Sequence, residues 1–314
     1  MSLLEKIILK TLAWFDLFQY PLTTWECWQW LYVNGEKIGI ISPLLVQVAL
    51  ENLRLLGKVK NYNGYWQLAD KESYLAYRLQ RSRWAIAKQK RAMAGIKLIS
   101  FLPFVRLVSL SNTVAWDAPS KDSDIDLFIV AKSGRLYLTR LLVTLLVHWR
   151  GWRRHGKYTS NRLCLSFYAT DQNLGLQDFA YKPDPYLAYW VASIMPLLDR
   201  FVYKNYLSSN DWVNAILPNW HRVIIKNDYY LHRAGNFSKR VQGLLEFVLS
   251  GRLGDWTESW AHSWQLPRIK NYLSTQTING PTDVVINDKV IKMHTNDRRQ
   301  QLANKFEARL SELL

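Results

Sequence analysis

Cysteine is scarce in this chain of 314 residues, which contains only Cys27 and Cys164. Both lie among apolar neighbours, so we expect buried thiols. Two cysteines exclude a disulfide framework, and neither they nor the six histidines have the spacing of a zinc site. Because free thiols are typical of a reducing compartment, a cytoplasmic location is expected.

Long apolar runs are also missing. The longest, residues 136–149, is interrupted by Thr139, Arg140 and Thr144 and is shorter than the roughly 20 residues that a spanning helix needs. The first residues lack the cleavage site of a signal peptide. We therefore expect no integral membrane span. A half-buried helix is the preferred interpretation of 136–149, and a membrane-surface helix is the alternative, because Trp and Arg residues follow it.

Acidic residues are few relative to basic ones. Asp and Glu number 25, Lys and Arg number 41, and the formal net charge is +16. A field of this sign favours polyanions such as nucleotides and nucleic acid. Hydrophobic residues make up 49% of the chain, which excludes a disordered protein. At about 100–200 residues per domain, the length predicts two or three domains.

The N-terminal part predicts three helices followed by a hairpin. Helical spacing begins at residue 3 and breaks at Tyr20-Pro21, and a second helix over 25–32 can be capped by a threonine. Ser42-Pro43 opens the third helix. Asn63-Gly64, flanked by alternating residues, is the strongest short signal of a hairpin. This order resembles a winged helix-turn-helix.

The next part predicts a mixed α/β unit. Apolar strands are expected over 104–110, 125–130 and 163–169, with a helix over 136–149 between the last two. The fold class is therefore α+β and multidomain. The predicted organisation is a winged helix-like domain (1–70), a connecting helix (71–103), an α/β core with a mixed sheet (104–182) and a mainly helical C-terminal domain (183–314).

Two aspartates alternate at the start of the second strand of this unit, in Ser123-Asp124-Ile125-Asp126-Leu127. Residues i and i+2 of a strand face the same way, so the carboxylates of Asp124 and Asp126 are expected to project together. Two adjacent carboxylates repel unless a cation lies between them, and Mg²⁺ prefers hard oxygen ligands. The pattern is compatible with a divalent-cation site, and an exposed strand start that carries alternating Asp is the alternative.

This segment resembles the metal-carboxylate segment of the DNA polymerase β superfamily of nucleotidyltransferases. Those enzymes carry Gly-Ser or Gly-Gly after an apolar strand and Asp-x-Asp about a dozen residues later. Here Ser111-Asn112-Thr113 follows the strand, and Thr113 lies eleven positions before Asp124. The motif covers about 20 residues, and the compatible order of elements covers 104–180.

The resemblance implies a function and its residues. Asp124 and Asp126 would be the catalytic and metal-binding pair, and Ser111, Asn112 and Thr113 would bind the nucleotide. The cofactor would be Mg²⁺, as two ions in an active enzyme. The reaction would transfer a nucleoside monophosphate from an NTP to a hydroxyl acceptor that the sequence does not identify.

The sequence departs from the family pattern at two places. Asn112 stands where the family has glycine, although Asn tolerates the left-handed backbone region better than other residues. Strand 163–169 contains no acid, whereas the family takes its third carboxylate from a later strand. Asp171, just past that strand, is the candidate third acid, and Asp117 and Asp122 are alternatives. Two outcomes stay open: an active modified site, or a degraded nucleotidyltransferase fold acting as a nucleic-acid-binding or regulatory scaffold.

A basic cluster follows the helix over 136–149. Arg150, Arg153 and Arg154 are candidates for contacts with phosphate or nucleic acid, and the neighbouring tryptophans could stack on bases. A solvated helix end is the equally weighted alternative. DNA binding by the third N-terminal helix also stays open, because that helix carries few cations. The whole arrangement resembles bacterial nucleotidyltransferase-domain proteins, which suggest no acceptor and no partner protein.

Overall fold

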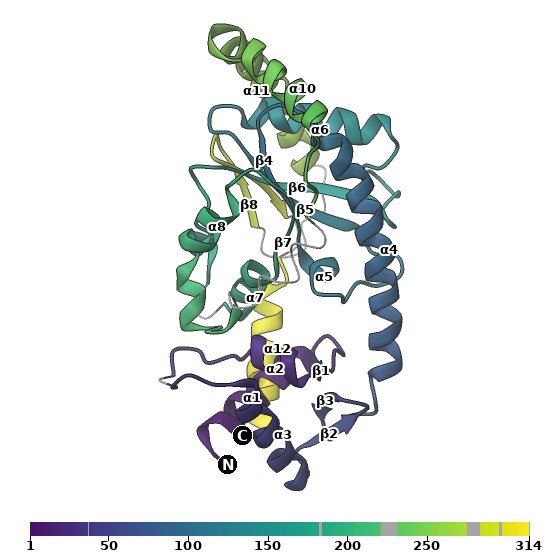
Figure 1. Cartoon of the computed structure of the whole chain (residues 1–314), viewed down its shortest axis with the longest axis vertical. Helices are drawn as coiled ribbons and strands as arrows, with labels where there is room; N and C mark the ends of the chain where they lie inside the picture. Colours follow the sequence, from purple (N-terminus) through teal and green to yellow (C-terminus); the bar gives the residue numbers. More distant parts are fainter. Residues whose placement is uncertain (37, 182–183, 221–230, 275–282, 295–296, 314) are drawn as a thin grey trace.

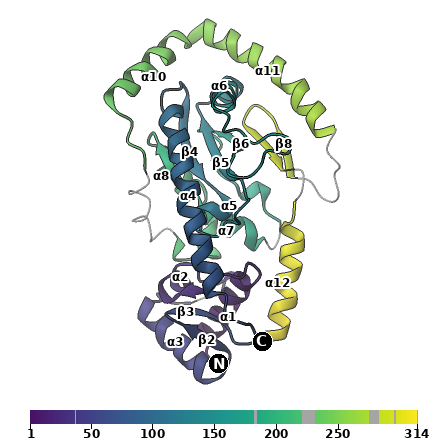
Figure 2. The ribbon, with the colours of Figure 1, turned by 90° about the vertical axis from the view of Figure 1, so that its right-hand side faces the viewer.

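The computed structural model describes residues 1–36, 38–181, 184–220, 231–274, 283–294 and 297–313. Within these ranges the chain is mixed α/β, with eleven α-helices, a three-stranded sheet and a six-stranded sheet. The N-terminal helices lie at one end of an elongated molecule, and the helices α10 (Asn236–Val248) and α11 (Gly251–Ser274) lie at the other (Figures 1 and 2). No helix in the described ranges combines the length and apolarity needed to cross a bilayer.

The N-terminal elements follow local sequence signals closely. They are α1 (Leu3–Asp16), β1 (Leu22–Thr23), α2 (Thr24–Gln29), α3 (Pro43–Leu55), β2 (Val59–Tyr62) and β3 (Tyr65–Leu68). Ser2, Thr23 and Ser42 each cap a helix by accepting a backbone N–H, which satisfies donors that have no partner in the first turn. Asn63 and Gly64 both have positive φ, as the tight hairpin turn requires. The three predicted helices and the hairpin are confirmed.

A long helix, α4 (Leu75–Ile99), connects this part to the six-stranded sheet (Figure 1). The strands of that sheet have the order β7-β4-β5-β6-β9-β8, and β5 and β6 are its parallel pair. The strands are β4 (Val105–Leu110), β5 (Ile125–Ala131), β6 (Leu163–Thr170), β7 (Met195–Asp199), β8 (Asp283–Ile286) and β9 (Val290–His294).

Helices cover both faces of this sheet. One face packs against α4, α6 (Leu136–Trp149) and α11 in a core that includes Ile125, Leu127 and Ile129. The opposite face carries Phe128, which contacts the aromatic rings of α7 (Pro185–Ser193) and α8 (Tyr203–Ser209). The alternation along β5 therefore separates two cores, as expected for a strand covered on both sides.

The C-terminal part, for which a mainly helical domain is predicted, contains strands as well as helices. It contributes β7, β8 and β9 to the sheet, so the predicted boundary at residue 182 divides that sheet. Pro196 lies inside β7. Because β7 is an edge strand, the missing N–H of proline is tolerated there. Val284-Val285-Ile286 and Val290-Ile291-Lys292 flank Asn287-Asp288, a pattern that predicts a short hairpin. The structure confirms this hairpin as β8 and β9, and β9 also pairs with β6.

The last helix, α12 (Arg299–Leu313), returns to the N-terminal end of the molecule (Figure 2). Its buried Phe306 packs edge-on against Trp14 and Tyr32. Its Arg309 bonds to Asp16 and Asp70. The last helix of the predicted C-terminal region (183–314) therefore packs against the N-terminal core.

Candidate metal centre

The two aspartates lie together at the start of β5. Asp124 directly precedes the strand and Asp126 is its second residue. Carboxylate oxygens of both residues and the thiol of Cys164 all lie within 4.8 Å of one another. Ile125 and Leu127 point into the core on the opposite face. The predicted projection of the two carboxylates to one side is confirmed.

The turn after β4 is bonded to this pair. The Ser111 N–H donates to the Asp126 carbonyl at 3.1 Å, and the Asn112 side-chain amide donates to the Asp126 carboxylate at 2.8 Å. The φ of Asn112 is 55°, in the left-handed region. Asn112 therefore holds a left-handed backbone conformation, which Asn tolerates better than other residues with a side chain. The Tyr186 hydroxyl of α7 donates to the other end of the same amide at 3.3 Å.

Buried polar side chains of α4 hold the loop between the turn and the aspartates. Gln89 donates to the Asp117 carboxylate at 3.0 Å, and Arg78 donates to the Asp117 carbonyl at 3.2 Å. The Lys88 ammonium donates to the Ser123 carbonyl at 2.7 Å, one residue before Asp124. Because donors along α4 bind both parts of the loop, the loop is fixed relative to β5. Sequence reasoning missed these anchors, since α4 looked like a solvated basic connector.

Cys164 is the site residue that sequence reasoning did not identify. It lies on β6 in register with Asp126 on the neighbouring parallel strand, so the two side chains share a face. Its sulfur lies 3.4 Å from the Ser166 hydroxyl oxygen. The strand from which the resemblance implies a third carboxylate therefore presents a thiol beside Asp126. Because only acids were considered as third ligands, Cys164 was passed over in the sequence. Its position at the start of the strand predicted over 163–169 could have indicated it.

Arg154 is the one arginine of the predicted basic cluster that reaches the pair. Its Nη1 lies 2.7 Å from the Asp124 carboxylate and 3.6 Å from the Cys164 sulfur. Arg150 instead lies over the Trp152 ring, at 5.2 Å from the ring centre. Arg153 forms a backbone bridge to Leu163. Of these three arginines, only Arg154 lies against the aspartates.

The electrostatics of the cluster indicate a shortage of positive charge. Burial, and then repulsion by Asp124, raises the pKa of Asp126 to about 6, although hydrogen bonds from Asn112 and Cys164 and the Arg154 charge act against the rise. Burial, and then the two aspartates, raises the pKa of Cys164 to about 12. The thiol is therefore protonated at neutral pH. Two carboxylates beside one guanidinium leave a surplus negative charge that a cation would neutralise.

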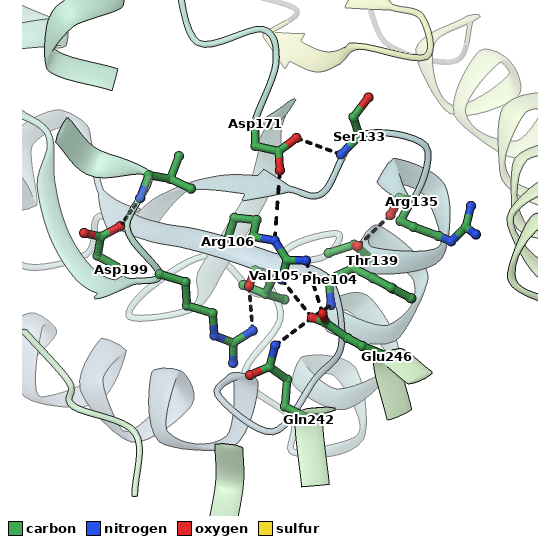
Figure 3. A network of polar contacts seen from close by, with 12 residues as sticks. Phe104, Val105, Arg106, Ser133, Arg135, Thr139, Asp171, Asp199, Gln242 and Glu246 are labelled. Atoms are coloured by element: carbon green, nitrogen blue, oxygen red, sulfur yellow. Dashed lines mark hydrogen bonds and ion pairs between the residues drawn. The ribbon is translucent and has the colours of Figure 1, made fainter. Parts of the chain in front are cut away.

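The other acids considered from the sequence lie elsewhere. Asp171 accepts the Ser133 N–H at 2.8 Å and lies 4.0 Å from Arg106 (Figure 3). Asp126 pairs with Cys164 near the start of β6, whereas Asp171 follows the end of β6, roughly 20 Å further along at about 3.3 Å per residue. The expectation that Asp171 supplies the third acid is therefore wrong. Asp117 faces α4, and exposed Asp122 accepts from Ser160.

An aromatic cavity of about 60 Å³ lies beside the turn. It is formed where α1 and the residues after α2 meet α5 (Asn112–Ala115) and α7. Asn112 and Thr113 supply part of its polar lining, and the remaining lining residues are Trp14, Phe15, Phe18, Trp30, Trp116, Tyr186, Tyr189, Trp190 and Ser193. A small apolar group could therefore lie next to the turn that carries Thr113.

The cluster thus joins two carboxylates, a thiol, an arginine and a left-handed turn at the end of the sheet where β4 ends and β5 and β6 begin. Comparison with family models, with curated proteins and with solved structures gave no match to this chain.

Proposed function

We propose that this chain is a nucleotidyltransferase-like protein of the polymerase β type, joined to an N-terminal winged helix-like unit. It would bind an NTP with Mg²⁺ at Asp124, Asp126 and the Asn112-Thr113 turn. One observation carries the proposal. The turn that the resemblance assigns to the phosphates is hydrogen-bonded directly to the carboxylate pair that it assigns to the metal.

The two carboxylates of the cluster suit Mg²⁺, and the thiol does not. Proteins usually hold Mg²⁺ by one or two carboxylates together with water and substrate phosphate oxygens. Asp124 and Asp126 meet that requirement, and the raised pKa of Asp126 supports the need for a cation. The Cys164 thiol is a soft ligand and adds little for Mg²⁺. When bound, Mg²⁺ would neutralise and orient the phosphates of the nucleotide.

The residues of the chain would divide the remaining tasks. The Arg154 side chain, half exposed, is available to contact a phosphate oxygen in place of the Asp124 carboxylate. The Thr113 hydroxyl would lie near the phosphates in the turn. Transfer forms a bond between an acceptor oxygen and the α-phosphorus and releases pyrophosphate, and the hydroxyl proton needs a base. Protonated Cys164 does not supply one.

That deficiency favours a second candidate, in which the fold binds nucleotide or nucleic acid without transfer and acts as a scaffold. An open groove of about 460 Å³ between α4 and the end of α6 supports it, because Lys90, Lys97, Arg150 and Trp152 contribute to its lining. Cations and an aromatic ring suit a single-stranded backbone and its bases. In contrast, α3 exposes Leu44 and Val48, and its Arg54 pairs with Glu51. Nucleic acid is therefore assigned to the groove.

One pair of assays separates these candidates. Binding of each NTP is measured by calorimetry with Mg²⁺ and with EDTA, and transfer is measured as label from an α-³²P NTP retained on RNA, protein or small-molecule acceptors. Asp124→Asn is the test variant, and Asp122→Asn is its matched control, because exposed Asp122 lies outside the cluster.

The transferase predicts Mg²⁺-dependent binding and labelling, both lost in Asp124→Asn and kept in Asp122→Asn. The scaffold predicts Mg²⁺-dependent NTP binding without labelling, or salt-sensitive binding of single-stranded nucleic acid that survives Asp124→Asn. Absence of NTP binding in all conditions would overturn the nucleotide-site proposal.

A further inference from the structure

The helices α10 and α11 carry an exposed apolar ridge at the end of the molecule opposite the chain termini (Figure 1). Figure 2 shows them arching over the outer end of the fold. We call their exposed large apolar side chains the outer ridge. They are Phe237, Leu244, Leu245, Phe247, Val248, Leu253, Trp256, Trp260, Trp264 and Tyr272. Phe237 is 73% exposed, Phe247 is 78% exposed and Trp256 is 66% exposed, so these side chains are not the margin of a core.

The arrangement along α11 is the reverse of an ordinary surface helix. Its buried residues are Gly254, Ala261, Gln265 and Ile269, so Ile269 is the one large aliphatic side chain among them. Trp256, Trp260 and Trp264 follow one another at four-residue spacing and form a stripe on the outward side. An amphipathic helix normally turns its large apolar residues toward the core. Here the three tryptophans point away from the core, which indicates that a lipid surface or another molecule covers them.

The acidic residues of the two helices all attach them to the α/β core. Glu246 accepts from the Phe104 N–H at 2.7 Å and from Arg106 at 2.8 Å (Figure 3). Asp255 pairs with Arg135 at 2.7 Å. Glu258 accepts the first backbone N–H groups of α6, from Tyr137 and Leu138, at 2.8 Å each. These contacts fix the orientation of the helices, turn Glu246 and Glu258 inward and leave exposed Asp255 neutralised by Arg135.

The cations of α10 and α11, unlike Glu246 and Glu258, are exposed to solvent. Lys239, Arg240, Arg252, Arg268 and Lys270 are exposed, and none forms an ion pair within the described part of the chain. Arg268 lies over the Trp264 ring at 4.0 Å from the ring centre. The outer side of this helix pair is therefore apolar and positively charged.

From these contacts we infer that the outer ridge docks the protein on the surface of an anionic lipid bilayer, with α10 and α11 lying in the interface. Indole rings favour the boundary between acyl chains and headgroups, aliphatic side chains gain by leaving water, and cations attract anionic headgroups. Single-stranded nucleic acid would use the rings and cations but gains little from Leu244, Val248 and Leu253. The inference is independent of the proposed nucleotide site.

Vesicle flotation of the full chain tests this inference. Vesicles of phosphatidylcholine alone are compared with vesicles of phosphatidylcholine mixed with phosphatidylglycerol. Binding is expected to the mixed vesicles, to weaken with added salt, and to shift the tryptophan emission to shorter wavelength. The combined variant Trp256→Gln, Trp260→Gln, Trp264→Gln should bind at least about tenfold more weakly, since even one partly buried aromatic ring contributes about that factor.

A matched control removes exposed tryptophans elsewhere. Trp25→Gln with Trp149→Gln should bind mixed vesicles like the unmodified chain, because these rings are at least half exposed but lie outside the ridge. If the triple variant does not fold by circular dichroism, the combined variant Arg252→Gln, Arg268→Gln, Lys270→Gln takes its place and should lose binding to mixed vesicles. Quenching of the unmodified chain by brominated lipid gives an independent reading.

Several outcomes would overturn the inference. The first is that the unmodified chain floats with neither kind of vesicle. The second is that the folded ridge variant floats as well as the unmodified chain. Self-association in sedimentation equilibrium that the ridge variant abolishes, without vesicle binding, would assign the ridge to a second copy. Binding of single-stranded nucleic acid that depends on the same tryptophans, without vesicle binding, would assign it to nucleic acid.

Discussion

Replacing Asp126 by Asn should make the protein more stable in the absence of metal, although the residue is assigned to the centre of the site. The pKa of Asp126 rises from 3.8 to about 6 on folding, because the carboxylate is buried beside Asp124. The folded protein therefore holds the proton more tightly than the unfolded chain between those values. Stability is lost as pH rises through this window, and the full cost is present above about pH 6.

The magnitude follows from the size of that rise. At about 1.4 kcal/mol for each pKa unit, the charged form of Asp126 costs up to about 3 kcal/mol at neutral pH. Solvent contact reduces this, so about 1–3 kcal/mol is expected. Asn keeps the size of the side chain and an acceptor for the Asn112 amide but carries no charge. Asp126→Asn should therefore raise the free energy of unfolding at pH 7 by about this amount.

Urea unfolding in EDTA at neutral and acid pH measures the effect. The gain should shrink below about pH 4, where Asp126 is protonated in both states. Asp122→Asn serves as the control and should change stability little, because that residue is exposed. Added Mg²⁺ should stabilise the unmodified protein and not the variant. An Asp126→Asn protein that is less stable than the unmodified chain at pH 7 in EDTA would refute the reasoning, since the carboxylate would then be a structural ion-pair member.

Substitutions at three further positions test parts of the site and of the outer end. Cys164→Asp adds a carboxylate opposite Asp126 and should tighten Mg²⁺ binding about tenfold in calorimetric titration; unchanged affinity would show that position 164 is not beside the metal. Asn112→Gly should keep the turn, whereas Asn112→Val should cost about 1–3 kcal/mol in urea unfolding, because a branched side chain is strained at positive φ; equal stabilities would contradict the assigned backbone. Contacts with Arg106 and Gln242 lower the pKa of Glu246 to about 2, against the opposing effect of burial, so its stabilisation is present above pH 4.5 and lost as pH falls toward 2. Glu246→Gln should therefore reduce the unfolding free energy by about 2–3 kcal/mol at pH 7 and by little near pH 2, and a pH-independent loss would contradict this assignment.

Local signals predicted much of the fold. The hydroxyl caps at Thr23 and Ser42 and the Asn63-Gly64 turn specify structure within a few residues, and all three form as expected. Long-range pairing is different. Nothing near Met195-Pro196 reveals that this segment pairs with β4, and nothing near Val290 reveals that it pairs with β6. Such partners are chosen by the packing of the whole sheet.

The site shows the same division. Alternation placed Asp124 and Asp126 on one face, and the tolerance of Asn for positive φ predicted that the turn would survive. The third position was sought at the end of β6, at Asp171, because an acid was expected there. Since β5 and β6 are parallel, the neighbour of Asp126 lies at the start of β6, where the chain has Cys164. The identity of a neighbour depends on strand direction, which the sequence of one strand does not state.

The outward placement of the tryptophans on α11 was equally hidden. Helical spacing predicts which residues share a face of a helix, but not which face turns to the core. That choice is made by Glu246 and Glu258, whose partners lie more than a hundred residues earlier in the chain. The exposed ridge therefore emerges only when the polar contacts of the inner face are known.

Diffraction from crystals grown with Mn²⁺ and a non-hydrolysable NTP analogue tests the central claim most directly, because Mn²⁺ scatters anomalously and accepts the same ligands as Mg²⁺. An anomalous peak bonded at about 2.1–2.2 Å to both Asp124 and Asp126, with phosphate oxygens against Asn112 and Thr113, is the predicted result. A nucleotide bound elsewhere, with Asp124 still paired to Arg154 and no peak between the aspartates, would contradict it.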